Sequence, residues 1–472
     1  MILRNANIYY RGEMISGAIL IQDGIIKSIY KQSNNDDFEL LKKKNNDGIE
    51  IDCEKRFILP GIIDIHSHLR DMGQSNKETF RTGTLAAAYS GITTVFAMPN
   101  TKPPAINAKQ IKKWKKKAKH NIFINVGFIS GVPKYIDEVE IKKILAQGVI
   151  GFKIYPLKSL NGVDWTISEN IQKLLQMSSK YQVPIFIHPD WPLEPEEEKK
   201  LKKKNSKLPY LKYYNKLHSE SNEAKYVDFI LEQYLKIIET SNSLSNTPIV
   251  HFCHISCKES FDKIQQFLEK NEKIHSLNIS LEVTPHHLLL SNDINLENEN
   301  IGKVLPPLRD KTQNSYLFDQ FKEGKIPLMG TDHAPHTIHE KSLNHDDAPS
   351  GFPGFETYSL LLLNKVFMNE LSLDTFLKVS SENPAKRFNL KQKGFIEKGN
   401  DADIIIVEKV GKFSINSKNF KTKAKFTPFE NSNLSDRESQ VLIWKVFLKG
   451  FEINTESAEP KGKIIKKEYI KA

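Results

Sequence analysis

The chain has 472 residues, and its 68 Lys and Arg residues against 57 Asp and Glu residues give a net charge of +11. With 39% hydrophobic and 26% charged residues, the composition is typical of a soluble globular protein and excludes collagen-like, disulfide-scaffold and wholly disordered chains. Three cysteines cannot form a disulfide framework, no apolar run could span a membrane and no signal peptide is recognisable, so we expect a cytoplasmic protein without a membrane partner.

Lysine-rich runs at residues 42–44, 112–119 and 199–204 carry much of the positive charge. Few aromatic residues are interleaved with them, and charge runs of this kind are typical of solvated surfaces. We therefore expect no nucleic-acid partner.

Both ends of the chain have the pattern of short β-strands. Residues 1–56 form strand-like pieces broken by glycines, and residues 401–407 and 440–448 resemble them in pattern. We expect residues 1–56 and 395–472 to form one small β-sandwich domain built from both chain ends.

The middle of the chain, residues 57–394, alternates short apolar runs with helical stretches, which is typical of βα units and a parallel sheet. Its eight candidate strands match a (β/α)8 barrel in number and total length. The predicted fold class is thus α/β, a (β/α)8 TIM-like barrel with a β-sandwich domain. The candidate strands are residues 57–65, 92–98, 121–128, 148–154, 183–187, 247–253, 278–284 and 326–331.

Two stretches interrupt this alternation. Residues 190–220 are rich in Lys, Glu and Pro, and residues 337–352 contain Asn344-His345-Asp346-Asp347. Because each follows a candidate strand, we expect both to be loops over one mouth of the barrel.

Polar side chains stand where the candidate strands end, and these ends converge on one face of a barrel. His66 and His68 are two residues apart, so a strand's period can turn both toward one ion. Alone the pair is weak evidence, because isolated histidines are more often surface or core residues. Further histidines and a carboxylate at independent strand ends make a catalytic zinc site the better interpretation. These are His188, His254 and Asp332.

Lys153 lies in the apolar segment Gly151-Phe152-Lys153-Ile154-Tyr155. A buried ammonium is costly unless it is neutralised or paired, and a lysine that reaches solvent with its head is the alternative. Beside two divalent ions, a neutral lysine amine that has taken up CO₂ would become a carbamate, which could bridge the metals.

Four motifs stand out along the chain. They are residues 57–70 (FILPGIIDIHSHLR), 98–101 (MPNT), 330–336 (GTDHAPH) and 351–357 (GFPGFET). In this order they resemble the motifs of the dihydroorotases of the cyclic amidohydrolase superfamily, and the resemblance spans about residues 50–410.

The resemblance implies a binuclear zinc site bridged by carboxylated Lys153. One ion would be held by His66, His68, Lys153 and Asp332, and the other by Lys153, His188 and His254. His254 is preferred to His251, because His254-Ile255-Ser256 matches the ligand motif of the family. A further metal role for Cys253 and Glu282 is left open.

The resemblance also implies substrate contacts at Arg70, Asn100 and His336, and a small-molecule substrate that carries a carboxylate. Asp332 would be the catalytic base and then acid in the reversible, zinc-dependent closure of N-carbamoyl-L-aspartate to L-dihydroorotate in de novo pyrimidine biosynthesis. One position departs from the family pattern. Leu305 precedes Pro306-Pro307 where relatives often have a polar residue, so that substrate contact is in doubt.

Three alternatives are kept. Allantoinases and the dihydropyrimidinases or hydantoinases share the barrel, the metals and the lysine, and an inactive dihydroorotase-like assembly partner is an alternative of another class. The last should have lost metal ligands, whereas this sequence retains all six. A homo-oligomer, a contact with aspartate transcarbamoylase and the identity of the metal in the cell are not decided by the sequence.

Overall fold

The computed structural model describes residues 1–31, 48–240, 246–274, 277–411, 414–431, 440–453 and 459–469. The lysine-rich run at residues 42–44 lies outside them. Among the residues described, no helix combines the length and the apolar character needed to cross a bilayer.

The centre of the molecule is a barrel of eight parallel strands, whose order in the sheet follows their order in the chain. An isolated parallel bridge between Ser67 and His333 brings the last strand next to the first and nearly closes the barrel. The strands are β6 (Ile62–Ser67), β7 (Ile92–Ala97), β8 (Asn125–Gly131), β9 (Gly151–Ile154), β10 (Pro184–Ile187), β11 (Ile249–Phe252), β12 (Ile279–Val283) and β13 (Leu328–Met329).

Helices alternate with these strands along the chain, and each strand is followed by at least one helix before the next begins. The longer ones are α2 (Phe80–Tyr89), α3 (Ala108–Ala118), α4 (Glu138–Leu145), α5 (Ser168–Tyr181), α8 (Glu220–Thr240), α9 (Lys258–Lys270), α11 (Lys311–Lys322) and α13 (Phe355–Phe367). Shorter ones are α10 (Pro285–Leu289), α12 (Ile338–Lys341), α14 (Leu373–Leu377) and α15 (Asn383–Arg387).

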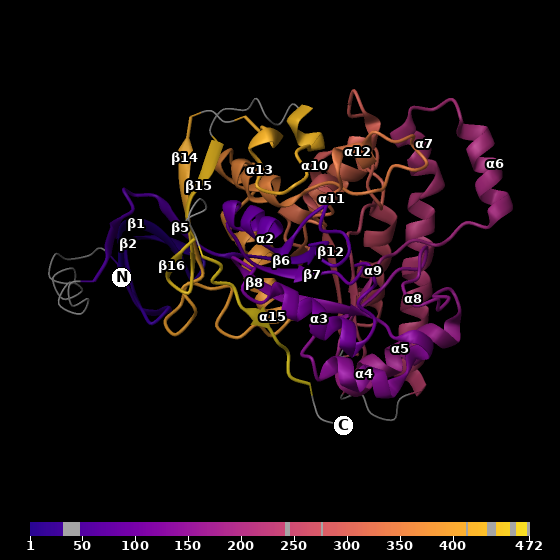
Figure 1. Cartoon of the computed structure of the whole chain (residues 1–472), viewed down its shortest axis with the longest axis horizontal. Coiled ribbons are helices and arrows are strands. Elements are labelled where there is room, and N and C mark those ends of the chain that lie inside the picture. Colours follow the sequence, from indigo (N-terminus) through magenta and orange to yellow (C-terminus); the bar gives the residue numbers. More distant parts are fainter. Residues whose placement is uncertain are drawn as a thin grey trace.

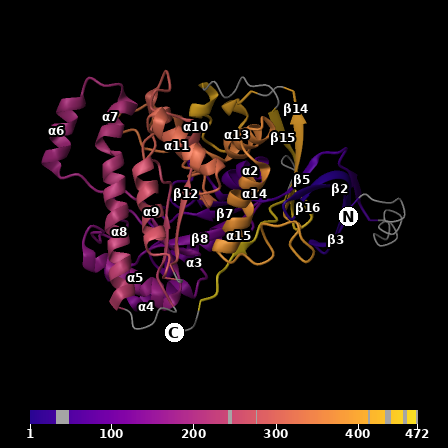
Figure 2. The same cartoon turned by 180° about the vertical axis from the view of Figure 1, so that it is seen from behind.

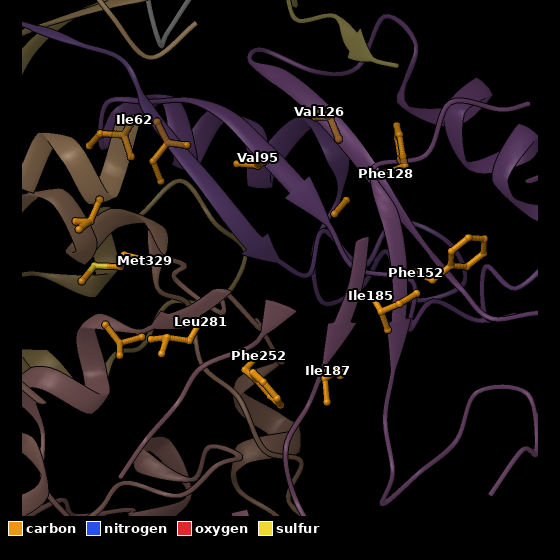
Figure 3. Packing of buried hydrophobic residues seen from close by; sticks show 14 of the residues in the cluster. Ile62, Val95, Val126, Phe128, Phe152, Ile185, Ile187, Phe252, Leu281 and Met329 are labelled. Atoms are coloured by element: carbon orange, nitrogen blue, oxygen red, sulfur yellow. The ribbon is translucent and has the colours of Figure 1, made fainter. Parts of the chain in front are cut away.

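Alternate residues of several barrel strands belong to two different hydrophobic clusters. On β10, Ile185 and Ile187 join the large cluster that includes helix residues, while Phe186 between them joins a second cluster with Ile63, Ile65 and Phe96. Figure 3 shows members of the large cluster along the strands. Because side chains alternate with a period of two, the position after Ile187 points to the barrel interior, which is where His188 stands.

The two ends of the chain form one mixed sheet beside the barrel (Figures 1 and 2). The sheet has its own core, to which Ile8, Ile19 and Phe447 belong. This confirms the predicted fold class, with the β unit made from both ends. Its strands are β1 (Ile2–Tyr10), β2 (Glu13–Gln22), β3 (Ile25–Lys31), β4 (Glu50–Asp52), β5 (Phe57–Pro60), β14 (Ile404–Val410), β15 (Gln440–Leu448) and β16 (Phe451–Glu452).

The predicted strand at residues 57–65 is wrong as a single element, because it is divided at Gly61. Its first part, β5, pairs with β1 and β14 of the mixed sheet, and its second part, β6, starts the barrel. A Cβ atom at Gly61 would overlap the side chain of Thr93 on β7, so the close passage between the two sheets requires glycine here. Near the C-terminal end, β17 (Ile464–Ile465) pairs with β8 of the barrel. The division of the chain into domains at residues 57 and 394 stays a prediction.

The two interrupting stretches contact each other, as expected of loops over one mouth. Residues 190–220 contain α6 (Pro195–Asn205) and α7 (Tyr210–Leu217), which lie on the side away from the mixed sheet (Figure 1). The Tyr210 hydroxyl donates to the His345 carbonyl oxygen at 2.9 Å, and Tyr214 shares a hydrogen bond with Ser350 at 2.8 Å. α6, which carries the lysines of residues 199–204, buries none of its residues.

Candidate active site

The carboxyl ends of the barrel strands bring the predicted histidines and Asp332 into one buried cluster. The ring of His66 lies 5.5 Å from that of His68 and 5.1 Å from that of His254, measured between centroids. The rings of His188 and His254 are 4.6 Å apart. Asp332 Oδ1 lies 3.0 Å from His68 Nε2 and 3.4 Å from His66 Nε2.

Lys153 lies beside this cluster, next to the Tyr155 ring that neighbours the His188 ring. Burial first and then the charge of Lys153 lower the pKa of His188, and burial, His188 and then Lys153 lower that of His254. The side chain of Lys153 is buried, and its Nζ lies 5.2 Å from the centre of the Tyr155 ring. All six residues predicted as ligands are therefore brought together. Their role as ligands stays a prediction.

Three residues of the site have a backbone conformation that L-amino acids rarely adopt. The φ angle is 54° at Arg70, 36° at His254 and 47° at Asp332. Such angles cost free energy and persist only where the surrounding structure fixes them, and they are typical of functional sites. Each of these residues stands just beyond a strand, where the chain turns its side chain over the mouth of the barrel.

Glu282, at the end of β12, orients His66. Its Oε1 lies 2.5 Å from His66 Nδ1, and its Oε2 lies 3.1 Å from His251 Nε2. Burial is the largest single effect on the pKa of His66 and lowers it, but the charges of Glu282, Cys253 and Asp332 together outweigh burial and raise this pKa to about 10. A carboxylate accepts the Nδ1 proton, so Nε2 of His66 faces Asp332. A histidine held by a carboxylate in this way is typical of metal ligands.

The cluster contains buried polar atoms that lack a hydrogen-bond partner among the described residues. They include Lys153 Nζ, His188 Nε2 and His254 Nδ1. An unpartnered buried polar atom is costly, and a site that binds a ligand accounts for it. Burial above all holds the pKa of His188 and of His254 well below the ordinary value. Both imidazoles are thus neutral and keep a lone pair for a metal ion.

The donor atoms fit a divalent metal by their spacing as well. In each of two groups, one donor atom per residue lies within 4.8 Å of the others. The first group is His66, His68 and Asp332, and the second is His66, Cys253 and Glu282. Imidazole and carboxylate groups suit a catalytic zinc site, so the residues present fit the predicted metal. The second group leaves open the hypothesis of a further metal role for Cys253 and Glu282.

The three residues predicted to contact substrate lie around this cluster. Asn100 Oδ1 is 2.6 Å from His68 Nδ1, so the amide also orients a predicted ligand. Arg70 is buried, its Nε has no hydrogen-bond partner among the described residues, and its Nη2 lies 3.3 Å from His336 Nε2. Leu305, the position that departs from the family pattern, is partly buried.

Sequence reasoning missed two residues of the site. Tyr155 is partly buried, its buried hydroxyl has no partner among the described residues, and its ring lies 6.1 Å from that of His188. The sequence does indicate Tyr155, because it follows Lys153 by one strand period and so faces the same side of the sheet. Lys77, whose Nζ lies 3.0 Å from His336 Nδ1, comes from the loop between β6 and α2, and no periodicity marks it.

Comparison with known proteins identifies the family to which the chain belongs. Residues 57–450 match the Amidohydrolase family, and the chain belongs to this family. The dihydroorotase of Methanosphaera stadtmanae is 34% identical over 88% of this chain and 88% of its own length. That of Pyrococcus horikoshii is 31% identical over 97% of this chain and 94% of its own length. The predicted resemblance to dihydroorotases is confirmed.

Solved structures agree with the fold. The L-hydantoinase (dihydropyrimidinase) of Arthrobacter aurescens has a TM-score of 0.83 at 23% identity, and covers 99% of both chains. A dihydropyrimidinase of Brevibacillus agri has a TM-score of 0.82 at 21% identity, over 100% of this chain and 99% of its own. At such identities the likeness concerns the fold, and the particular reaction must be argued from the site.

Proposed function

We propose that this enzyme is a dihydroorotase, which closes N-carbamoyl-L-aspartate reversibly to L-dihydroorotate in de novo pyrimidine synthesis. The observation that carries the proposal is the place of Arg70 and His336 beside the cluster of histidines and Asp332. The similarity to named dihydroorotases over most of the chain supports it. A small-molecule substrate with a carboxylate is what such a site would select.

The proposed cofactor is a pair of zinc ions bridged by N-carboxylated Lys153. His66, His68, Lys153 and Asp332 would hold one ion, and Lys153, His188 and His254 the other. Lys153 suits the role because its amine is buried and has no hydrogen-bond partner among the described residues. As a neutral amine it would add to CO₂ and release one proton, which leaves an anionic carbamate. When bound, the two ions would lower the pKa of a water molecule and polarise the amide carbonyl of the substrate.

Asp332 would move the proton. The nearby His66 and His68 outweigh the effect of burial and hold the pKa of Asp332 far below its usual value, so the carboxylate is ionised and ready to accept. In the hydrolytic direction, Asp332 takes a proton from the attacking water as the bond between the ring amide carbon and nitrogen breaks. It then gives this proton to the departing nitrogen. Ring closure runs the same steps backwards and releases water.

Arg70 would bind the substrate carboxylate. A guanidinium donates two parallel hydrogen bonds to a carboxylate, and burial of Arg70 strengthens this charge-assisted pair. Dihydroorotate carries the carboxylate that hydantoins and dihydropyrimidines lack. The similarity in fold to a hydantoinase makes a neutral cyclic amide the specific rival substrate.

The test compares substrates and one pair of variants. The zinc-loaded enzyme is assayed with dihydroorotate, dihydrouracil, hydantoin and allantoin, and in reverse with N-carbamoyl-L-aspartate. We expect turnover of dihydroorotate and carbamoyl aspartate, and at least a hundredfold lower kcat/KM for the others. Removal of the charge partner in Arg70→Met should cost roughly 2–5 kcal/mol, about 30- to 5,000-fold in kcat/KM. Arg70→Lys keeps the charge but cannot donate two parallel hydrogen bonds, so its kcat/KM should lie between those of the wild type and Arg70→Met.

Equal turnover of a neutral cyclic amide, or full activity of Arg70→Met on dihydroorotate, would contradict the proposal. No turnover of any substrate by the metal-loaded chain would favour the inactive assembly partner. We further propose that the enzyme works in the cytoplasm, which agrees with its three free cysteines. Whether the enzyme forms a homo-oligomer, or binds aspartate transcarbamoylase, stays a hypothesis. Light scattering of the enzyme, alone and mixed with aspartate transcarbamoylase, would measure the mass of the particles and so test both.

A further inference from the structure

Both ring nitrogens of the buried His336 are engaged by groups of fixed hydrogen-bonding character. Nδ1 lies 3.0 Å from Lys77 Nζ, and Nε2 lies 3.0 Å from the carbonyl oxygen of Ser350. Arg70 Nη2 is 3.3 Å from the same Nε2. The imidazole thus has Lys77 and, further away at 3.7 Å, Glu340 Oε2 on its Nδ1 side, and a carbonyl and Arg70 on its Nε2 side.

The two shortest contacts, with Lys77 and Ser350, favour one neutral tautomer over the other. An ammonium group only donates, so Nδ1 facing Lys77 must accept and carries no hydrogen. A carbonyl oxygen only accepts, so the hydrogen stands on Nε2 and is donated to Ser350. Arg70 therefore cannot donate to Nε2, and its guanidinium is left for another acceptor. Burial first, and then the charges of Arg70 and Lys77, hold the pKa of His336 well below its ordinary value, which keeps the ring neutral.

Lys77 is itself held in place. Its Nζ lies 2.7 Å from Glu340 Oε1, and its side chain is 11% exposed. Glu340 is fixed in turn by the first turn of α12, where its other carboxylate oxygen accepts from the backbone N–H of Thr337 at 3.0 Å. The segment after β13 thus anchors a lysine from the loop after β6, and that lysine contacts a histidine of the same segment.

We propose that Lys77 is a positioning residue that fixes His336 as the tautomer with hydrogen on Nε2, so that an N–H beside Arg70 faces the substrate carboxylate. The inference rests on the proposed function, in which Arg70 and His336 bind that carboxylate. With the substrate absent, Ser350 takes this hydrogen bond. In the other tautomer the lone pair of Nε2 would face the carboxylate and repel it.

The kinetic test uses three variants of the zinc-loaded enzyme. Lys77→Met keeps the length of the side chain but removes the donor, and Lys77→Arg restores a group that only donates. We expect Lys77→Met to raise the KM for dihydroorotate about tenfold or more while kcat changes less than threefold, because a hydrogen bond to the bound carboxylate is weakened. Lys77→Arg should have a KM close to that of the wild type.

Lys117→Met is the matched control. Lys117, on α3, forms an ion pair of 2.6 Å with Asp71, which lies in the same β6–α2 loop as Lys77. Lys117 does not contact His336. If Lys77 only anchored the loop, Lys117→Met would raise the KM for dihydroorotate to a similar extent, and Lys77→Arg would not restore the KM of the wild type. A KM of Lys77→Met equal to that of the wild type would also overturn the inference.

A spectroscopic measurement decides the tautomer without any assay. In wild-type protein with ¹⁵N-labelled histidine, the His336 ring signals, assigned by their loss in His336→Asn, should show a bare Nδ1 and a protonated Nε2. In Lys77→Met the signals should move toward a mixture of tautomers. A protonated Nδ1 in the wild type would overturn the inference. If the wild type does not turn over dihydroorotate, the proposed function fails, whereas these signals still decide what Lys77 does.

Discussion

Asp332 has the left-handed backbone of a residue that its surroundings hold in place, with φ at 47°. Its carboxylate faces His66 and His68, which account for its low pKa against the effect of burial. An ionised carboxylate in contact with two imidazoles, and strained in backbone, is better suited to moving protons and holding a metal than to stabilising the barrel.

Asp332→Asn should therefore lower kcat by about 10³-fold or more, because an amide of the same shape cannot take up the proton. Bound zinc, measured by elemental analysis, should fall as well if Asp332 is a ligand. Asp319→Asn, on the exposed part of α11, is the control and should leave both unchanged. Turnover of Asp332→Asn within tenfold of the wild type would exclude its role in proton transfer.

Lys153→Ala tests the carbamate. Without the bridging anion, the variant should lose zinc and activity together, and a short carboxylic acid such as acetate or propionate should restore part of both by occupying the vacated space. Lys158→Ala, five residues further along the chain and exposed, should behave as the wild type. A crystal structure in which Lys153 keeps a plain ammonium turned away from bound metals would exclude the bridge.

At the residue scale, the strand period predicts the side chains at strand ends, whereas His336, well beyond β13, is predicted only from the family resemblance. His188 and Lys153 could be found because a period of two turns them inward between apolar neighbours. The contact of Glu282 with His66 joins two strands that are distant in sequence, and Lys77 lies on a loop. Such contacts depend on the packed fold, which no local pattern encodes.

Among the elements, all eight barrel strands were predictable, because each is a short apolar run between helical stretches. The division of residues 57–65 into β5 and β6 was not, since both parts are apolar and they differ in the strands with which they pair, which the local sequence does not encode. The pairing of β17 with β8 was missed for a related reason. A strand of two residues has too little sequence to show a period.

Helix α10 provides a prediction of pH dependence at this scale. His287 Nδ1 accepts from the Thr284 hydroxyl at 2.8 Å, and Nε2 donates to the Pro306 carbonyl oxygen at 3.1 Å. Burial, followed by the charge of His286, holds the pKa of His287 well below 6.5. Below about pH 6.5 the unfolded chain thus binds a proton that the folded chain does not, so stability is lost as the pH falls.

Relative to His287→Gln, the wild type should lose about 1.4 kcal/mol of unfolding free energy between pH 7.5 and 5.5. Denaturant titrations of both proteins at the two pH values measure this difference. The effects of other groups that gain protons cancel, because they are common to both proteins. An equal loss in the two proteins would show that His287 is not kept neutral by the fold.

At the scale of the whole molecule, the mixed sheet lies on one side of the barrel and α6 and α7 on the other (Figures 1 and 2). Hydantoinases share this arrangement closely while only about a fifth to a quarter of the residues are identical. The architecture therefore sets where the strand ends meet, and we propose that the side chains placed there, Arg70 above all, decide which cyclic amide is bound.

The same arrangement predicts how the molecule responds to removal of metal. The proposed ligands come from the ends of β6, β9, β10 and β11 and from the segment after β13, so a bound pair of ions would join five parts of the barrel that are distant in sequence. A ligand that binds only the folded state stabilises it by about 4 kcal/mol when present at roughly a thousand times its Kd. Chelation should therefore lower Tm by several degrees and abolish activity, and added zinc should restore both. Lys153→Ala is the control, because its Tm should respond to neither treatment. A Tm of the wild type that chelation leaves unchanged, although elemental analysis shows that the zinc is gone, would mean that the ions do not hold these strand ends together.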